Sequence, residues 1–240
     1  MGLYSVIKMW NGKKKAITIS SDDGVIQDKR FVDILNKYGL KATFNINSGM
    51  MYNECVWVCE GVEIRRMTAK ECRKLFANHE IAAHSLTHPT LTALDDYMFE
   101  RQIVGDKVNL ETIFGRKITG FALPGGTSDK RLPDLCKRFG IKYVRGSCES
   151  KGFDVPENFY DISATVRYSN DEVFELIEDF INLNPASSKI MHIYGHSYEM
   201  DINNSWERFE EICRRISGRN DIFYGTNDEV YAPFFEVKEK

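Results

Sequence analysis

Cysteine is scarce in this 240-residue chain, which contains six cysteines and no Cys-x-x-Cys pair. They are Cys55, Cys59, Cys72, Cys136, Cys148 and Cys213. Disulfide-built domains are far richer in cysteine, and structural zinc sites normally use closely spaced cysteine pairs. We therefore expect reduced, mostly buried thiols, and neither a disulfide framework nor a thiolate metal site.

Long apolar runs and an excess of positive charge are also missing. No run approaches the roughly 20 apolar residues of a membrane-spanning helix, so we expect no membrane partner. Residues 1–8 lack the apolar block of a signal peptide, which predicts a cytoplasmic protein. The formal net charge is −3, which argues against general nucleic-acid binding, because phosphate contacts need a basic surface.

The chain does contain a regular alternation of strand-like and helix-like segments. Strand-like runs lie at 16–20, 41–46, 80–83, 117–122, 141–144, 189–194 and 221–224. Such alternation predicts an α/β fold in which about seven parallel strands are joined by helical crossovers, as a barrel or a long open sheet. No linker composition interrupts it, so we expect one domain over residues 1–240. The stretches 48–66 and 147–170 are predicted to be long loops.

Local signals mark several helix ends. Thr68 and Glu71 are spaced as a capping box at the start of a helix predicted over 68–78. Ser128 is predicted to cap a helix that ends at Gly140, and Phe31, Ile34 and Leu35 share the spacing of one helix face.

Polar residues follow most of the predicted strands at the end where each strand finishes. In parallel α/β folds these ends meet on one side of the sheet, where functional side chains gather. The residues at these positions are Asp22, Asp23, Asn45, Asn47, His84, His88, Pro124, Gly125, Gly126, Arg145, His192 and His196.

Two histidines and an acidic pair carry the clearest chemistry in this set. His84 and His88 lie four residues apart just past a strand, and the pair Asp22-Asp23 follows another. Two imidazole nitrogens and one carboxylate form a zinc-type site with open positions, and a second carboxylate beside it is placed to act as a base. His192 sits within an apolar strand, as a core histidine would, whereas His196 follows Gly195 at the strand exit.

These residues fall within motifs that resemble those of the polysaccharide deacetylases, carbohydrate esterase family 4 (the chitooligosaccharide deacetylase homology domain). The segment 19–24, ISSDDG, resembles the family's T-F-D-D-G motif. The segment 79–91, HEIAAHSLTHPTL, resembles G-H-E-I-G-N-H-[ST]-x-x-H-P-x-L. FALPGG at 121–126 takes the place of F-R-P-P-Y-G, and 190–196 covers the leucine-x-histidine region.

The resemblance implies a distorted (β/α) barrel and metal-dependent removal of an acetyl group from an N-acetylated sugar. By matching positions, Asp23, His84 and His88 would bind the metal, and Asp22 would be the general base. A late histidine would be the general acid; the leucine-x-histidine pattern favours His192, and the strand exit favours His196, which we prefer. A backbone N–H near Gly125 would help to hold the oxyanion.

The chain departs from these motifs at three positions. Ala122 stands where the family has an arginine that tunes the base, and Arg145, on the adjacent strand end, is a possible substitute. Gly125 replaces an aromatic residue, and Ser21 replaces phenylalanine. Asn47 and His192 are further candidates for supporting roles.

The alternatives left open are a hydrolase of the same fold that cuts another non-peptide C–N bond, and a catalytically silent carbohydrate-binding protein. A zincin-type protease fits poorly, because its two histidines lie on a helix, with a glutamate beside the first. The expected cofactor is a divalent metal, zinc first, with cobalt, nickel or iron also compatible. The expected partner is a carbohydrate or small N-acetylated substrate; the sequence does not indicate the oligomeric state.

Overall fold

Strand β1 (Lys15–Asp22) lies at the centre of the sheet, and every one of its residues is buried. A strand covered on both faces is typical of parallel sheets flanked by helices. β1 pairs in parallel with β10 (Lys189–Gly195) along its whole length, with β11 (Ile222–Tyr224) at its start, and with β2 (Thr43–Ile46) at its end. The polar residues that end β1 are therefore placed beside the ends of β2 and β10.

The computed structural model describes residues 9–51, 55–126 and 128–236. Its main sheet has nine strands in the order β8-β7-β6-β5-β2-β1-β10-β9, with β11 paired to β1, and all of the pairings are parallel. The strands not yet given are β5 (Glu80–Ala83), β6 (Gly120–Ala122), β7 (Tyr143–Glu149), β8 (Ile162–Ala164) and β9 (Val166–Arg167).

The two ends of this strand order meet at one residue. β8 pairs with β7, β9 pairs with β10, and only Thr165 separates β8 from β9. One bent segment thus connects the two edges of the sheet, which gives a distorted (β/α) barrel of the expected class.

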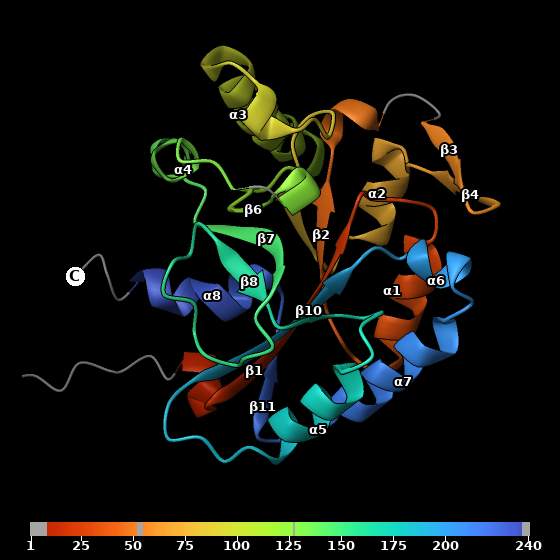
Figure 1. Cartoon of the computed structure of the whole chain (residues 1–240), viewed down its shortest axis with the longest axis vertical. Coiled ribbons are helices and arrows are strands. Elements are labelled where there is room, and N and C mark those ends of the chain that lie inside the picture. Colours follow the sequence, from red (N-terminus) through yellow and green to blue (C-terminus); the bar gives the residue numbers. More distant parts are fainter. Residues whose placement is uncertain (1–8, 52–54, 127, 237–240) are drawn as a thin grey trace, which may run out of the picture.

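Helices cover the outside of the strands (Figure 1). They are α1 (Asp28–Lys37), α2 (Ala69–Leu75), α3 (Asp96–Phe114), α4 (Leu132–Phe139), α5 (Val173–Asn182), α6 (Glu199–Ile202), α7 (Trp206–Ile216) and α8 (Asn227–Glu236). The predicted face of α1 is buried, and its Phe31 stacks on Phe209 of α7 with ring centroids 4.2 Å apart. The predicted Thr68–Glu71 capping box is formed at the start of α2.

Both stretches predicted as long loops contain strands. Within 48–66, β3 (Val56–Cys59) and β4 (Val62–Arg65) form an antiparallel hairpin. Its turn residues Glu60 and Gly61 have φ of 48° and 82°, the left-handed pair that a type I′ turn requires, but glutamate is an unusual residue there. Within 147–170, β7 continues to Glu149, and β8 and β9 follow. These two strands are too short to show a period-2 pattern.

Several predicted boundaries were also wrong, among them the starts of α4 and β6. α4 begins at Leu132 rather than after Ser128, with Pro133 in its first turn, where a missing N–H costs nothing. β6 begins at Gly120 rather than Lys117.

None of the six cysteines is in a disulfide in the described part of the chain, as expected. No helix of the described residues is long and apolar enough to cross a membrane. Residues 1–8, on which the expectation of no signal peptide depends, lie outside the described residues.

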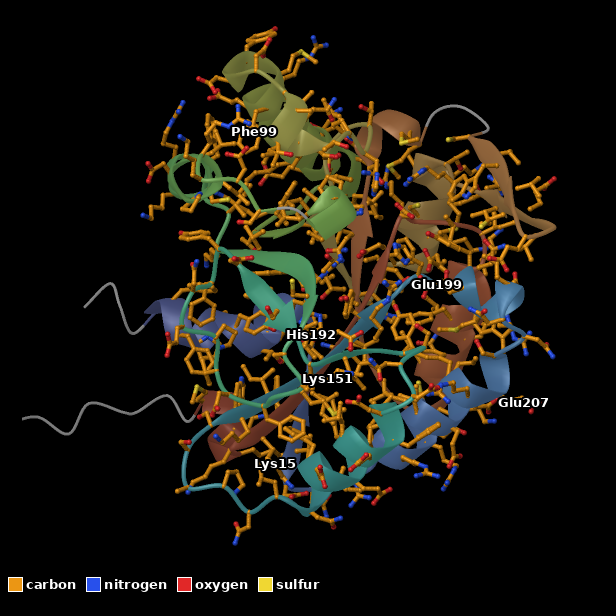
Figure 2. The ribbon with its side chains drawn as sticks, viewed as in Figure 1. Lys15, Phe99, Lys151, His192, Glu199 and Glu207 are labelled. Carbon is orange, nitrogen blue, oxygen red and sulfur yellow. The ribbon has the colours of Figure 1, made fainter. Side chains whose placement is uncertain are left out.

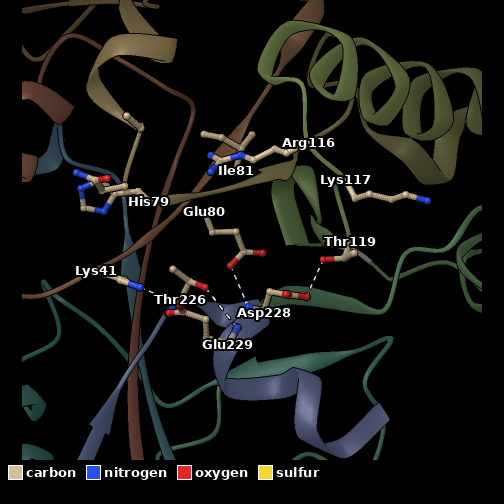
Figure 3. Close-up of a pocket in the computed structure, with 12 residues that line it drawn as sticks. Lys41, His79, Glu80, Ile81, Arg116, Lys117, Thr119, Thr226, Asp228 and Glu229 are labelled. Carbon is tan, nitrogen blue, oxygen red and sulfur yellow. Dashed lines mark hydrogen bonds and ion pairs between the residues drawn. The ribbon is translucent and has the colours of Figure 1, made fainter. Parts of the chain in front are cut away.

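The end of the barrel opposite the strand exits holds a cavity of about 470 Å³ (Figure 3). Glu80, the first residue of β5, lies in its wall and accepts hydrogen bonds from the Tyr143 hydroxyl (2.6 Å), the Thr43 hydroxyl (2.7 Å) and the Asp228 backbone N–H (2.9 Å). Burial raises the pKa of Glu80 from 4.5 to about 7, although these hydrogen bonds lower it.

We expect this carboxyl group to make the protein less stable as the pH rises from about 4.5 to about 7, with no further loss above that range. In this window the native state keeps a proton that the unfolded chain has released. Each such proton contributes a slope of about 1.4 kcal/mol per pH unit. Glu80→Gln should therefore flatten the dependence of unfolding free energy on pH by about that slope, measured by urea denaturation. Part of the pH dependence should remain in this variant, because burial also raises the pKa values of Asp28 and Asp106 to about 7. An unchanged slope would show that Glu80 is ionised in the native state.

Candidate active site

Three side chains of the predicted metal set come together at the strand exits. Asp23 directly follows β1, and His84 and His88 lie on the loop after β5. The Asp23 Oδ1 atom is 3.9 Å from His84 Nε2 and 4.0 Å from His88 Nε2. One ligand atom from each residue lies within 4.8 Å of the others, so the three can share one ion.

His84 is held in the form that a metal ligand needs. Its Nδ1 lies 2.8 Å from the carbonyl oxygen of Ala122, so this nitrogen carries the hydrogen and donates it. The Nε2 atom is left with its lone pair, and it is buried with no hydrogen-bond partner among the described residues. Burial lowers the pKa of His84 to about 4, although Asp22 and Asp23 raise it, so the ring is neutral near pH 7. An unpaired buried acceptor beside a carboxylate and a second imidazole fits a divalent cation.

Asp106 fixes the backbone around His84. This buried residue of α3 accepts hydrogen bonds from the backbone N–H groups of His84 (2.8 Å) and Ser48 (2.7 Å). The Ser85 hydroxyl accepts a hydrogen bond from the His88 N–H at 3.1 Å. Both histidines are thus positioned through their backbone, and His84 through its ring as well.

Arg66 binds Asp23 from the other side. Its guanidinium donates to the Asp23 carbonyl oxygen (2.7 Å), to Asp23 Oδ1 (3.0 Å) and to the Asn47 side-chain oxygen (2.5 Å). Asn47, predicted as a supporting residue, donates in turn to the carbonyl oxygens of His84 and Ser85. Burial raises the pKa of Asp23, but neighbouring positive charge, that of Arg66 first, outweighs burial, so the net pKa is lowered.

The backbone is in an uncommon conformation at this site. Asp23, Ser85 and His88 have φ values of 83°, 66° and 56°, in the left-handed region that non-glycine residues avoid. Such conformations cost about 1–3 kcal/mol each and persist where surrounding contacts enforce them. Here the bonds from Arg66, Asn47 and Asp106 supply that enforcement.

Asp22, the last residue of β1, is buried and held by two donors. Asn45 Nδ2 donates to its Oδ1 at 2.7 Å, and one nitrogen of Arg145, Nη2, forms an ion pair with both of its carboxylate oxygens. Burial raises the pKa of Asp22, but the neighbouring positive charge of Arg145 lowers it more strongly, so the carboxyl group is ionised at neutral pH. Arg145 lies directly opposite Ala122 in the β6–β7 register. An arginine from the strand next to position 122 therefore contacts Asp22.

We expect Arg145→Met to lower the free energy of unfolding by about 3–5 kcal/mol, because it leaves the Asp22 charge buried and unpaired. Asp22→Asn combined with Arg145→Met should recover most of this loss, since both charges are then absent. Urea denaturation of wild type, both single variants and the double variant measures the coupling. Additive losses would show that the pair contributes little to folding.

The two late histidines have different surroundings. His192, on β10, is 1% exposed, and its ring nitrogens lie 2.9 Å from the Ser20 hydroxyl and 3.0 Å from the Tyr231 hydroxyl. His196 follows β10, and its Nε2 lies 3.9 Å from Asp22 Oδ2 and 4.0 Å from Asp23 Oδ2. Figure 2 shows His192 near the centre of the molecule and Glu199, the partner of His196, to one side. Of these two histidines, His196 is the one whose Nε2 faces the acidic pair.

Gly125 lies in the 3-10 turn η4 (Pro124–Gly126), at the exit of β6. It has a φ of 62°, and a Cβ atom built there would meet nothing within 4 Å. The replacement of the aromatic residue thus leaves this side of the site open.

Three residues that contact the site were not found from the sequence: Arg66, Asp106 and Glu199. Asp106 could have been found from the sequence, because it is a carboxylate on the same helix face as the buried Ile103 and Leu110. Glu199 lies three residues after His196, a spacing that brings side chains together on a helical turn. No such signal marks Arg66, because its contact with Asp23 depends on the end of the β3–β4 hairpin lying against residues 24–26, which follow β1.

Comparison with known proteins agrees with the geometry. The family model described as polysaccharide deacetylase matches residues 10–144. The uncharacterized protein YlxY of Bacillus subtilis is 28% identical over 107 residues, which cover 45% of this chain and 30% of that protein's length.

Solved structures show the same fold at low identity. The family 4 esterase domain of a multidomain xylanase from the hindgut metagenome of Trinervitermes trinervoides has a TM-score of 0.61 at 16% identity, covering 93% of this chain and 92% of that one. A family 4 carbohydrate esterase from Streptomyces lividans, in complex with acetate, has a TM-score of 0.55 at 16% identity, with 89% and 93% covered. A family 4 pseudoenzyme from Bacillus anthracis has a TM-score of 0.53 at 17% identity, with 91% and 65% covered. The matched model, which covers more than half of the chain, establishes that this protein belongs to the polysaccharide deacetylase family.

Proposed function

We propose that this protein is an active metal-dependent deacetylase that removes the acetyl group from an N-acetylated sugar. The observation that carries the proposal is the unpaired, buried Nε2 of His84, which lies beside Asp23 and His88 and on the same side of the barrel as Asp22 and His196. The buried, ionised Asp22 carboxylate beside this site supports an enzyme over a silent carbohydrate-binding protein, because it is placed to accept a proton.

Asp23, His84 and His88 would hold the divalent ion, with zinc as the first candidate. When bound, such an ion polarises an acyl oxygen and lowers the pKa of water. Their donor set, two neutral imidazoles and one carboxylate, also suits cobalt, nickel or iron.

Asp22 would accept the proton of the attacking water. Arg145 and Asn45 fix its carboxylate, and His196 lies across the site from it at 3.9 Å. His196 would then donate a proton to the departing amine nitrogen, which is too basic to leave as an anion. Burial lowers the pKa of His196, but its bond to Glu199 and the charges of Asp22 and Asp23 outweigh burial, so the net pKa is raised. This direction favours the protonated ring that a general acid needs.

Two aromatic side chains border this side of the molecule and support a substrate with an apolar face. Trp57 of β3 contacts Tyr198 edge to face, with ring centroids 5.9 Å apart, and the Arg66 guanidinium lies over the Trp57 ring. Tyr198 also packs against the His196 ring. The hairpin missed in the sequence thus contributes a wall next to the proposed proton donor.

The direct test incubates zinc-loaded protein with a chitooligosaccharide series and measures acetate and new primary amine together. We expect equal amounts of both, and neither after chelation. Acetate from an O-acetylated sugar, with no product from the chitooligosaccharides, would indicate an O-esterase. Ammonia, or a new amine without acetate, from cyclic amides or amidines would favour a hydrolase of another C–N bond. No product from any of these substrates would contradict the proposed activity.

A further inference from the structure

We infer that Glu199 is a positioning residue that fixes the ring and tautomer of His196, and that Arg167 holds Glu199 in place. This inference rests on the proposed function, in which His196 delivers the proton to the leaving group. His196 Nδ1 lies 2.9 Å from Glu199 Oε1, and Arg167 forms an ion pair with the same oxygen. The three residues come from the exit of β10, the start of α6 and the end of β9.

The chain between His196 and Glu199 is a fixed turn. The Glu199 backbone N–H donates to the His196 carbonyl oxygen at 3.1 Å, which begins α6. Just before it, Gly195 passes the Tyr168 ring so closely that an added Cβ would lie 2.5 Å from a ring carbon. The Tyr168 hydroxyl is itself bound to the Ser20 carbonyl oxygen. The direction in which His196 leaves the strand is therefore set by packing, and only the rotation of its ring remains to be fixed.

Glu199 fixes the rotation of the His196 ring at a cost in folding free energy. Its side chain is 20% exposed, and its Oε2 is buried with no hydrogen-bond partner among the described residues, while Oε1 receives both His196 and Arg167. A buried acceptor without a partner costs about 1–3 kcal/mol.

An acceptor on Nδ1 determines which nitrogen can act. The neutral ring keeps its hydrogen on Nδ1, and Nε2 faces Asp22 and Asp23 with a lone pair. In the protonated ring, Nε2–H points at the site. As the C–N bond breaks, its electron pair passes to nitrogen, nitrogen takes the Nε2 proton, and the ring returns to the Nδ1–H tautomer. The proton that Asp22 took from water then reprotonates the ring.

The first test separates proton delivery from general structure by using two leaving groups. With Glu199→Gln, we expect kcat for an N-acetyl sugar to fall about 10–100-fold with little change in KM, since part of a general-acid contribution is lost. On nitrophenyl acetate, whose phenolate departs without a proton, kcat should change less than about threefold. Equal losses on both substrates would overturn the inference, as would unchanged activity on both. Glu172→Gln, which alters an exposed glutamate paired with Lys151, is the matched control.

The second test does not depend on activity. ¹⁵N NMR of the His196 ring in the metal-free protein should show the Nδ1–H tautomer in wild type and its loss in Glu199→Ala. Retention of that tautomer in Glu199→Ala would overturn the inference. A wild-type protein that shows the tautomer but hydrolyses neither substrate would instead contradict the proposed function and leave the positioning role standing.

Discussion

Replacing Asp22 with asparagine is expected to lower kcat for N-acetyl hydrolysis by about 10²–10⁴-fold, the usual contribution of a general acid–base group. Asparagine keeps the size of the side chain but cannot accept the proton of the attacking water. The carboxylate is buried, ionised and aligned by Arg145 and Asn45, so its position is already set before substrate arrives. Steady-state kinetics on a chitooligosaccharide, with zinc content measured on the same sample, tests this expectation.

Two observations would separate this role from a structural one. Zinc content should be unchanged in Asp22→Asn, because Asp23, His84 and His88 remain. Asp96→Asn, which alters a carboxylate that is 91% exposed, should leave kcat unchanged. A variant at position 22 that keeps full turnover would refute the proton-acceptor role, and a wild-type protein that binds sugar without turnover would favour the silent binding protein.

Removing one imidazole is expected to abolish metal binding and activity together. We expect His84→Ala to weaken zinc affinity by more than the 10–100-fold that typically follows loss of an outer partner, because a direct ligand is lost. Wild-type protein treated with a chelator should lose activity and regain it on addition of zinc, whereas His84→Ala should not regain it. Calorimetric titration of zinc into metal-free protein measures the affinity.

His79 provides the matched control for this experiment. It is also a buried histidine, but it lies in the wall of the cavity at the opposite end of the barrel and contacts the Ala42 backbone N–H. His79→Gln should bind zinc as wild type does. Equal zinc affinity in His84→Ala and wild type would place the metal elsewhere.

The arrangement of the central polar residues follows from the sequence alone because it needs only the order of the strands. Parallel strands finish at one side of the barrel, so residues just past 22, 83 and 195 meet there wherever the helices pack. The capping box at Thr68 could also be predicted from the sequence, since it depends on four consecutive residues.

The contacts that hold this site in place were harder to predict from the sequence, because they come from distant parts of the fold. Arg66 reaches Asp23 through a hairpin whose turn uses glutamate, and Asp106 reaches His84 from the middle of a helix. The substitution of Arg145 for the residue at 122 was a conjecture from the sequence; only the β6–β7 register shows that the two positions are direct neighbours. Short strands such as β8 and β9 are defined by their partners rather than by their own pattern.

The most direct test of the central claim is an anomalous difference map, collected at the zinc absorption edge, from crystals grown with zinc. We predict one strong peak bounded by the Asp23 carboxylate, His84 Nε2 and His88 Nε2, with Asp22 beside it. A map with no peak at these three side chains, or with the ion bound at another part of the molecule, would contradict the account.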